Sequence, residues 1–339
     1  MPGNGSRFAN RSRARLACAL VALVALAACA RDASVPGHRA DWSDAVPLLD
    51  YAATGDDPTS AEDLVVPEPD PAEPDPAPTD QAESADAAPD LALVDLTLPD
   101  VAGCPPAPDG TAGPLHALFI GNSYTYVNDL PGTFSHLATA GGRQVSVDSL
   151  ANGGWTLYEF STDAATASKL AQGGWDVLVL QEQSQVPTIP SAFEYGTIPG
   201  AKALVAMARA ASPCVRTVLF ETWGRQDGGQ QCGGSDCSAA FADFDAMQDS
   251  LSASYQTLAG VIGAAVAPVG EAWRIVRHEH PEIGLFGGDG SHPSMEGTYL
   301  AACVFYGRIL AASPIGLPAD GGATSTDVLQ AAAVAALGK

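Results

Sequence analysis

The sequence predicts an α/β domain whose parallel sheet is covered by helices on both faces. From residue 115 onward, five short apolar runs alternate with longer stretches of helical spacing. Uninterrupted apolar runs of this kind are typical of strands that are buried on both faces. Strands that alternate with helices form parallel sheets, because a helix provides each return crossing.

The five strands are expected at the apolar runs. The first run ends at Gly121, which permits a sharp turn, the second alternates apolar with polar residues, and the third is apolar after Asp176. The expected strands cover residues 115–121, 144–150, 176–180, 215–223 and 264–269.

The helices are expected between and after these strands, and the stretch before the fourth strand is rich in alanine, the strongest helix former. They cover residues 130–140, 155–170, 199–211, 241–262 and 295–312. In parallel sheets the ligand site lies beyond the carboxyl ends of the strands. Polar residues that directly follow a strand are therefore the candidates for chemistry.

The N-terminus has the pattern of an export signal. Four arginines precede an apolar run, residues 16–28, that is short for a transmembrane helix. The run ends in Leu26-Ala27-Ala28-Cys29, which resembles the lipobox of bacterial lipoproteins and implies cleavage before Cys29 and acylation of that cysteine. An ordinary secretory signal that is cut at a small residue is the alternative. We expect residues 1–28 to be a signal peptide and the exported chain to be held by lipid on a membrane, on the periplasmic or cell-surface side.

Acidic residues dominate the exported chain, and the formal net charge is −23. Residues 29–112 combine proline with Asp and Glu and predict a disordered tether, in which the apolar patch 91–98 is a candidate for docking on the domain. The absence of a basic stripe in the sequence excludes nucleic acid as a partner. The globular domain is expected at 113–313, followed by a C-terminal tail or helix at 314–339, and a monomer is expected.

Five cysteines follow Cys29, and an oxidising compartment favours disulfides between them. Cys232 and Cys237 close a small ring and are the first choice for a pair. Cys104 and Cys214 are candidates for a second pair, and Cys303 in an apolar helix is expected to be a buried thiol. No second ligand pair accompanies Cys232 and Cys237, so we expect no zinc site and no cofactor.

Two polar segments at strand exits predict nucleophilic catalysis. Gly121-Asn122-Ser123 follows the first strand and exposes Ser123 at the edge of the sheet. Asp289-Gly290-Ser291-His292 precedes the last helix, and an aspartate three residues before a histidine can orient its imidazole. A serine hydroxyl needs a base within hydrogen-bond reach, and His292 is the expected base.

Two further segments offer donors for an oxyanion hole. Gly154 follows the second strand, and a glycine there lets a backbone N–H approach a developing negative charge. After the third strand, the side-chain amide of Gln183 or of Gln181 is a candidate for another donor.

These four segments, in this order, resemble the SGNH (GDSL-type) hydrolase superfamily, in the branch whose first block reads Gly-Asn-Ser-x-Thr. The resemblance covers residues 115–310 and implies a three-layer α/β/α sandwich of flavodoxin-like type with a five-stranded parallel sheet. It implies that Ser123 is the nucleophile, that its N–H and that of Gly154 are oxyanion donors, and that Asp289 and His292 are the acid–base pair. The third block of the family carries Asn in the oxyanion hole, whereas this chain offers Gln183, which aligns best, or Gln181.

Several other side chains have a structural and a functional interpretation. His278-Glu279-His280 resembles a metal cluster but lacks a third ligand and is expected to be a surface helix end, and Ser294 is expected to cap the last helix. Trp223 and Trp155 either line a substrate pocket or pack in the core. Arg225 and Gln226 are candidates for a substrate rim.

The expected function is an extracytoplasmic serine esterase that hydrolyses acetyl or short-acyl esters, including esters of carbohydrates, through an acyl-enzyme on Ser123. One alternative is an O-acyltransferase that uses the same triad with a sugar hydroxyl as acceptor. The other is a catalytically weak lipoprotein that binds surface glycans.

Overall fold

The computed structural model describes residues 98, 101–106, 108–233, 236–319 and 322–338. The predicted signal peptide, the lipid-bearing Cys29 and the tether up to residue 97 lie outside the described residues. Of the predicted docking patch only Leu98 is described, and it is 6% exposed and belongs to the core.

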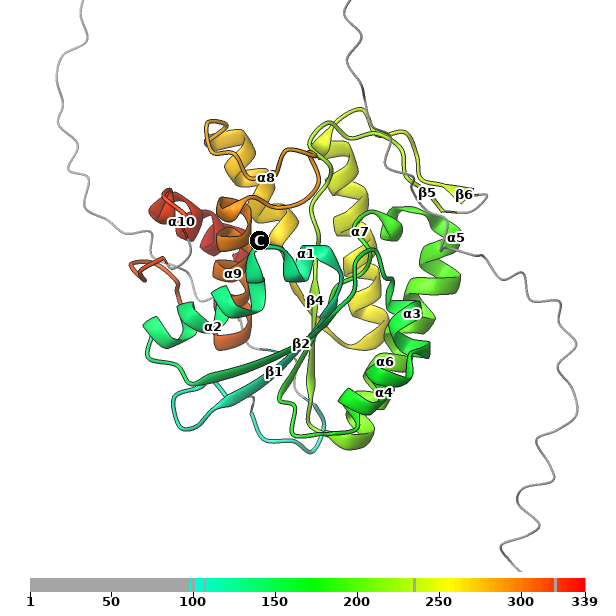
Figure 1. The fold of residues 1–339 in the computed structure, drawn as a ribbon, viewed down its shortest axis with the longest axis vertical. Coiled ribbons are helices and arrows are strands. Elements are labelled where there is room, and N and C mark those ends of the chain that lie inside the picture. Colours follow the sequence, from blue (N-terminus) through cyan, green and yellow to red (C-terminus); the bar gives the residue numbers. More distant parts are fainter. Residues whose placement is uncertain (1–97, 99–100, 107, 234–235, 320–321, 339) are drawn as a thin grey trace, which may run out of the picture. The chain divides into compact units, whose positions relative to one another are not determined.

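Five parallel strands form the central sheet, in the order β2-β1-β3-β4-β7 (Figure 1). Its register pairs Leu115 with Val145 and Leu180 with Leu219. The order is that of flavodoxin-like sheets, and the predicted fold class is confirmed. The strands are β1 (Leu115–Gly121), β2 (Val145–Ala151), β3 (Val177–Leu180), β4 (Arg216–Phe220) and β7 (Ala265–Ala267).

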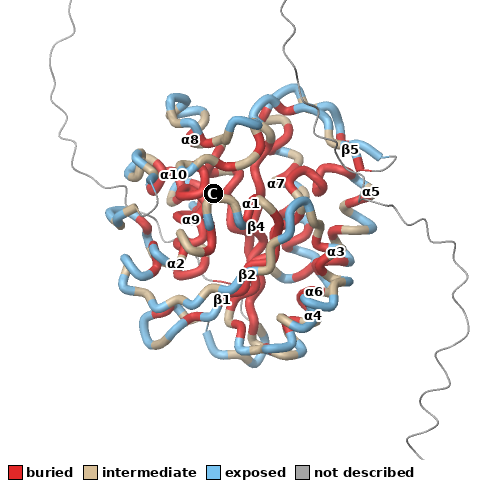
Figure 2. Tube along the Cα trace, in the orientation of Figure 1, coloured by how far each residue is buried: buried red, intermediate tan, exposed pale blue. Residues whose placement is uncertain are grey.

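Helices cover both faces of the sheet (Figure 1). Alternate residues of β1 point to opposite faces, so Phe119 enters one core and Ile120 the other. The first core is covered by α2 (Leu130–Ala140), α8 (Val269–Glu279), α9 (Met295–Leu310) and α10 (Thr326–Leu337). The second is covered by α3 (Leu157–Thr162), α4 (Ala164–Leu170), α6 (Ile198–Ala211) and α7 (Phe244–Ile262). Figure 2 shows the central strand β4 buried between the two helical layers, whereas the edge strand β2 is partly exposed.

Short elements connect these layers and build the edge of the sheet where the strands end. They are α1 (Ser123–Tyr126), η2 (Val127–Asp129), η3 (Val186–Thr188), α5 (Pro190–Ala192) and η4 (Phe193–Thr197).

The structure differs from the predicted elements in two places. The single helix expected at 155–170 is two helices, because Asp163 is extended (φ −86°, ψ 132°) and its carboxylate accepts a hydrogen bond from Thr166 N to begin α4. Helix α8 was not among the predicted helix ranges, although a helix end was expected at His278–His280, where α8 does end; its start directly after the last strand has no side-chain cap.

The C-terminal segment packs with the domain. Leu329 and Ala333 of α10 are fully buried in the same core as α9, and Gln330 donates a hydrogen bond to Tyr299 Oη at 2.7 Å. Helix α10 is therefore an integral layer of the fold.

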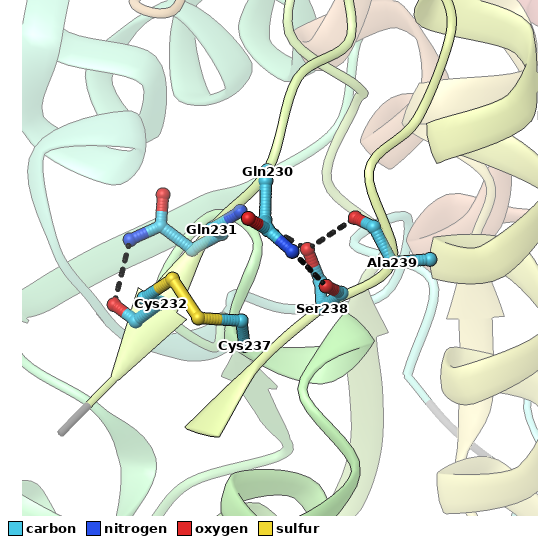
Figure 3. Close-up of a disulfide and its surroundings, with 6 residues drawn as sticks. All are labelled: Gln230, Gln231, Cys232, Cys237, Ser238 and Ala239. Atoms are coloured by element: carbon cyan, nitrogen blue, oxygen red, sulfur yellow. Dashed lines mark hydrogen bonds between the residues drawn. A yellow bond between two sulfur atoms is a disulfide. The ribbon is translucent and has the colours of Figure 1, made fainter. Parts of the chain in front are cut away.

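The described residues contain two disulfides, Cys104–Cys214 and Cys232–Cys237, and Cys303 is a buried free thiol. The second disulfide joins the short strands β5 (Cys232–Gly233) and β6 (Asp236–Cys237), beside which Ser238 donates to Ala239 O (Figure 3). Disulfides are typical of proteins that fold outside the reducing cytoplasm, which supports an extracytoplasmic domain. Within the described residues, no helix is long and apolar enough to cross a membrane.

Loss of the Cys104–Cys214 bond should destabilise the fold more than loss of Cys232–Cys237. The first closes a sequence separation of 110 residues and the second one of 5, so the first restricts the unfolded chain far more. We expect the double Cys→Ser variant at Cys104 and Cys214 to lose about 4 kcal/mol of unfolding free energy, and the matched variant at Cys232 and Cys237 about 2 kcal/mol. Chemical denaturation checks both, and equal losses would contradict the prediction.

Candidate active site

The turn after β1 presents Ser123 at the carboxyl end of the sheet. A side chain at Gly121 would lie within 2.5 Å of both Thr125 Oγ1 and Gln181 Oε1, so only glycine fits there. Asn122 Oδ1 accepts a hydrogen bond from Tyr124 N at 3.2 Å, which caps α1, and its Nδ2 donates to Trp155 O at 3.1 Å. Asn122 thus joins the turns that follow β1 and β2 and leaves Ser123 partly exposed.

Asp289, His292 and Ser123 form a continuous series of hydrogen bonds. His292 Nε2 lies 2.8 Å from Ser123 Oγ, and His292 Nδ1 lies 2.5 Å from Asp289 Oδ2. Asp289 Oδ1 also accepts hydrogen bonds from the backbone N–H groups of Ser291 and His292, at 3.0 and 2.9 Å. Burial raises the pKa of Asp289, but these hydrogen bonds outweigh it and hold the pKa below its usual value. Asp289 therefore stays ionised beside the imidazole.

The turn that carries Asp289 and His292 is anchored to the core by hydrogen bonds of the buried residue Ser291. Trp223 Nε1 donates to Ser291 O at 2.9 Å, and Tyr124 Oη lies 2.6 Å from Ser291 Oγ. Trp223 is fully buried and stacks between Tyr124 (4.5 Å between ring centroids) and Trp273 (3.9 Å). Trp223 is thus a packing residue with one polar contact, and the substrate-pocket interpretation does not apply.

Gly154 lies in an exposed turn after β2. Its φ is +75°, a conformation that favours glycine, and a Cβ there would meet no atom within 4 Å. Among the described residues, none accepts a hydrogen bond from the Gly154 N–H. This N–H is therefore available to a ligand. Trp155 beside it is half-buried and packs on Phe160 (5.0 Å between centroids).

The two candidate glutamines have different environments. Gln181 is fully buried, and its Nε2 donates to Asn122 Oδ1 at 2.8 Å and to Glu182 O at 2.7 Å, so both amide hydrogens are used. Gln183 is partly exposed, and its buried Oε1 has no partner among the described residues. Gln181 is a structural link between strand exits, and only the amide of Gln183 is free to donate.

Glu182, directly after Gln181, is a buried carboxyl group whose role is not evident from the sequence pattern. Its Oε1 accepts hydrogen bonds from Leu157 N at 3.1 Å and Gln183 N at 2.6 Å, so it joins the loops that carry Gly154 and Gln183. Complete burial raises its pKa to about 7. Its only signal in the sequence was a charged residue between the two candidate glutamines, directly after a strand.

Glu221 is a second buried carboxyl group, directly after β4. Its Oε1 accepts hydrogen bonds from Gln248 Nε2 and Ser252 Oγ, both at 3.2 Å. Burial, and then the charge of Glu271, raise its pKa to about 8. Both buried carboxyl groups keep their protons at pH values where the unfolded chain has lost them.

We expect the unfolding free energy to fall as the pH rises from 5 to 8. In that window the folded state binds more protons than the unfolded state, so each raised carboxyl group lowers stability by up to about 1.4 kcal/mol per pH unit. The decrease from Glu221 should level off above its folded pKa of about 8. Urea titrations at several pH values measure the slope. Glu221→Gln should flatten it and Glu194→Gln, at an exposed carboxylate, should not; an unchanged slope in the first variant would contradict the assignment.

The other sequence candidates have structural roles. His278 and His280, at the exposed end of α8, pair with Asp245 at 2.9 Å and Glu282 at 3.3 Å. Ser294 Oγ accepts a hydrogen bond from Gly297 N and caps α9. Among the described residues, no group of three His, Cys, Asp or Glu is placed to hold a metal.

Two of the rim candidates lie beside the acid–base turn. Arg225 Nε donates to Gln185 Oε1 at 3.0 Å, and Gln185 Nε2 donates to Tyr124 Oη at 3.5 Å. Gln226 N donates to Gly290 O at 2.9 Å. Both residues therefore support the segments around the site.

Serine, histidine and aspartate side chains hydrogen-bonded in series at the carboxyl edge of a parallel sheet have the arrangement that serine hydrolases use. The chain matches no protein-family model and no curated protein. Solved structures similar to it include a DUF4886 family protein from Bacteroides uniformis, with 18% identity, 66% of this chain and 95% of that chain covered and a TM-score of 0.57. This similarity establishes a shared fold.

Other similar structures are described as hydrolases. One is an SGNH hydrolase by description, from Slackia heliotrinireducens, with 27% identity, 58% of this chain and 100% of that chain covered and a TM-score of 0.46. Another is a carbohydrate esterase family 3 protein from Talaromyces cellulolyticus, with 14% identity, 58% and 97% coverage and a TM-score of 0.43.

Proposed function

We propose that this chain is a serine esterase that hydrolyses carboxylic esters through an acyl-enzyme on Ser123. The observation that carries the proposal is the hydrogen-bonded series from Asp289 through His292 to Ser123. A serine hydroxyl becomes nucleophilic only with a base in hydrogen-bond contact, and His292 Nε2 has that contact at 2.8 Å.

In acylation, Ser123 Oγ attacks the ester carbonyl carbon while His292 Nε2 takes the hydroxyl proton. Asp289 holds the tautomer that has its proton on Nδ1 and stabilises the imidazolium that forms. The carbonyl oxygen becomes an oxyanion, which receives hydrogen bonds from the N–H groups of Ser123 and Gly154 and from the Gln183 amide. The ester C–O bond then breaks, and His292 returns the proton to the leaving alcohol.

In deacylation, water replaces the alcohol. His292 takes a proton from the water as it attacks the acyl carbon, and the same donors hold the second oxyanion. Breakage of the bond to Ser123 Oγ releases the carboxylic acid, and His292 returns the proton to the serine.

The substrates we propose are acetyl or short-acyl esters of carbohydrates. Tyr126 and Tyr158, each 48% exposed, follow Ser123 and Gly154 in the chain. Tyr126 Oη lies 3.2 Å from the position of a Cβ on Gly153, so this ring adjoins the proposed oxyanion loop. An exposed aromatic face that ends in a hydroxyl suits a sugar ring, which has an apolar face and polar edges.

We further propose that the enzyme is exported and held on a membrane by lipid on Cys29. The support is the lipobox-like sequence that precedes Cys29 and the two disulfides of the domain. Metabolic labelling with a palmitate analogue tests the anchor, and Cys29→Ser should abolish the label and release the protein from membranes.

A fluorophosphonate probe tests the proposed activity. The folded full chain should react with the probe, peptide mapping should locate the adduct on Ser123, and prior reaction should stop turnover of acetylated sugars and p-nitrophenyl acetate. The heat-denatured chain provides the control, because activation of the serine needs the folded triad. A folded protein that neither reacts with the probe nor cleaves any ester of the panel would refute the proposal.

Trp223→Phe should lower kcat about tenfold with little change in KM. The change removes the hydrogen bond to Ser291 O and frees the turn that carries Asp289 and His292. Trp273→Phe is a matched control, because Trp273 is fully buried in the same stack but its Nε1 has no partner among the described residues. Steady-state kinetics and thermal melts of both variants separate positioning from stability; equal kcat values would contradict the positioning role.

A further inference from the structure

A cavity of about 310 Å³ lies beside the proposed active site and has no part in the proposed reaction. It lies between the end of α8, the loop after β4 and the segment 281–286. Its apolar wall consists of Pro281, Ile283, Leu285 and Phe286, and its polar groups come from Gln226 and Arg277. A cavity that combines apolar walls with convergent polar groups has the elements of a small-molecule site.

Arg277 is the cation of this cavity. Its guanidinium lies 4.6 Å from the Phe244 ring centroid and 5.2 Å from that of Phe286, and Nη2 donates to Gln226 O at 3.1 Å. Within the part of the chain that the structure describes, this carbonyl is its one hydrogen-bond acceptor, and no carboxylate lies within 4.0 Å. Since a guanidinium has five N–H donors, most of them remain for a ligand.

Arg274, one turn earlier on α8, differs from Arg277 in having carboxylate partners. It contacts the carboxylates of Asp245 at 3.5 Å, Asp249 at 2.7 Å and Glu271 at 3.5 Å. Burial lowers the pKa of Arg277, although the charges of Asp245 and Asp227 oppose this effect. Arg277 is thus a partly desolvated cation that lies close to two aromatic rings and, among the described residues, lacks an ion pair.

We propose that this cavity binds a small monocarboxylate that has an apolar body. The carboxylate accepts paired hydrogen bonds from the Arg277 guanidinium, a geometry for which the planar fork is suited. The apolar body packs on Phe286, Ile283 and Pro281. A dianion fits less well, because Asp227 and Asp245 are close enough to act on Arg277 and would repel a second negative charge.

The walls of the cavity are continuous with the acid–base turn. Gln226 N donates to Gly290 O at 2.9 Å, and Phe286 pairs with Pro293 as an isolated bridge. A ligand between Gln226 and Phe286 therefore contacts both segments that flank the turn. Hydrolysis of an ester releases a carboxylate, so the proposed reaction generates a ligand of the class that this second site fits. The binding proposal does not depend on catalysis.

Calorimetric titration of benzoate into the full chain tests the proposal. The titration uses Ser123→Ala protein, so that the result is independent of ester turnover. We expect a dissociation constant of about 1 mM or tighter, weaker at high salt, and no measurable binding of benzyl alcohol, which has the same ring without the charge. Arg277→Gln should weaken benzoate binding at least about tenfold, that is, by about 1.4 kcal/mol or more.

Two further variants complete the test. Arg274→Gln removes the same charge from the same helix and should leave the affinity within about twofold, because that cation already has carboxylate partners. Arg277→Lys keeps the charge but loses the planar fork, so it should keep only part of the affinity and tests the paired hydrogen bonds if Arg277→Gln folds poorly. Equal binding of benzyl alcohol, unchanged affinity in Arg277→Gln or Arg277→Lys, or a crystal of the complex with benzoate elsewhere would each overturn the proposal.

Discussion

Ser123→Ala is expected to lower ester turnover by about 10⁴- to 10⁶-fold, the range typical of losing a serine nucleophile. The Ser123 hydroxyl lies 2.8 Å from His292 Nε2, and no other hydrogen bond to that nitrogen is present among the described residues. Residual turnover should come only from binding and from the oxyanion donors. Stopped assays with p-nitrophenyl acetate and with acetylated glycans measure the loss.

The variant should keep its fold, because Ser123 is partly exposed and the serine side chain is small. Its thermal midpoint should lie close to that of the wild type. Ser168→Ala, on α4, is a control for loss of one serine hydroxyl and should keep full activity and full fluorophosphonate labelling. Turnover or labelling that survives in Ser123→Ala would exclude Ser123 as the nucleophile.

Asp289→Asn is expected to lower kcat by about 10³- to 10⁴-fold. Asparagine Oδ1 can still accept the hydrogen bonds from Ser291 N and His292 N, so the turn should persist. The group that faces His292 Nδ1 loses its charge and no longer favours a proton on that nitrogen. The loss should appear in kcat, with a small change in the melting temperature.

Asp227→Asn is a matched control, because it removes one charge from an exposed residue of a nearby loop and should keep kcat within about twofold. The lowered pKa of Asp289 gives a second check. Since its folded pKa lies below the unfolded value, its stabilising contribution is present above about pH 4 and is lost as the pH falls through the folded pKa. The Asn variant should lack this part of the acid dependence, and full activity of that variant would exclude an orienting role for Asp289.

The sequence predicted the sheet because apolar runs report burial directly. All five strands occur within a few residues of the expected positions, and β1 has the expected bounds. The split of the helix at Asp163 was not predicted, because a capping carboxylate and an ordinary helix residue look alike in an apolar pattern. Helix α8 was missed for a related reason, since it begins without a capping side chain.

Local spacing by itself predicted that Ser123, Asp289 and His292 follow strands or precede a helix, and that Asp289 reaches His292 across three residues. Only the tertiary structure decided which glutamine has a side-chain amide that is free to donate. The ends of β1 and β3 lie side by side, so the Gln181 amide is used in a hydrogen bond to Asn122. The same holds for Glu182, which joins loops that are distant in the sequence, and for Arg277, whose missing ion pair depends on the residues packed around it. Strand burial is encoded within a few residues, whereas the availability of a polar group depends on every neighbour that the fold brings to it.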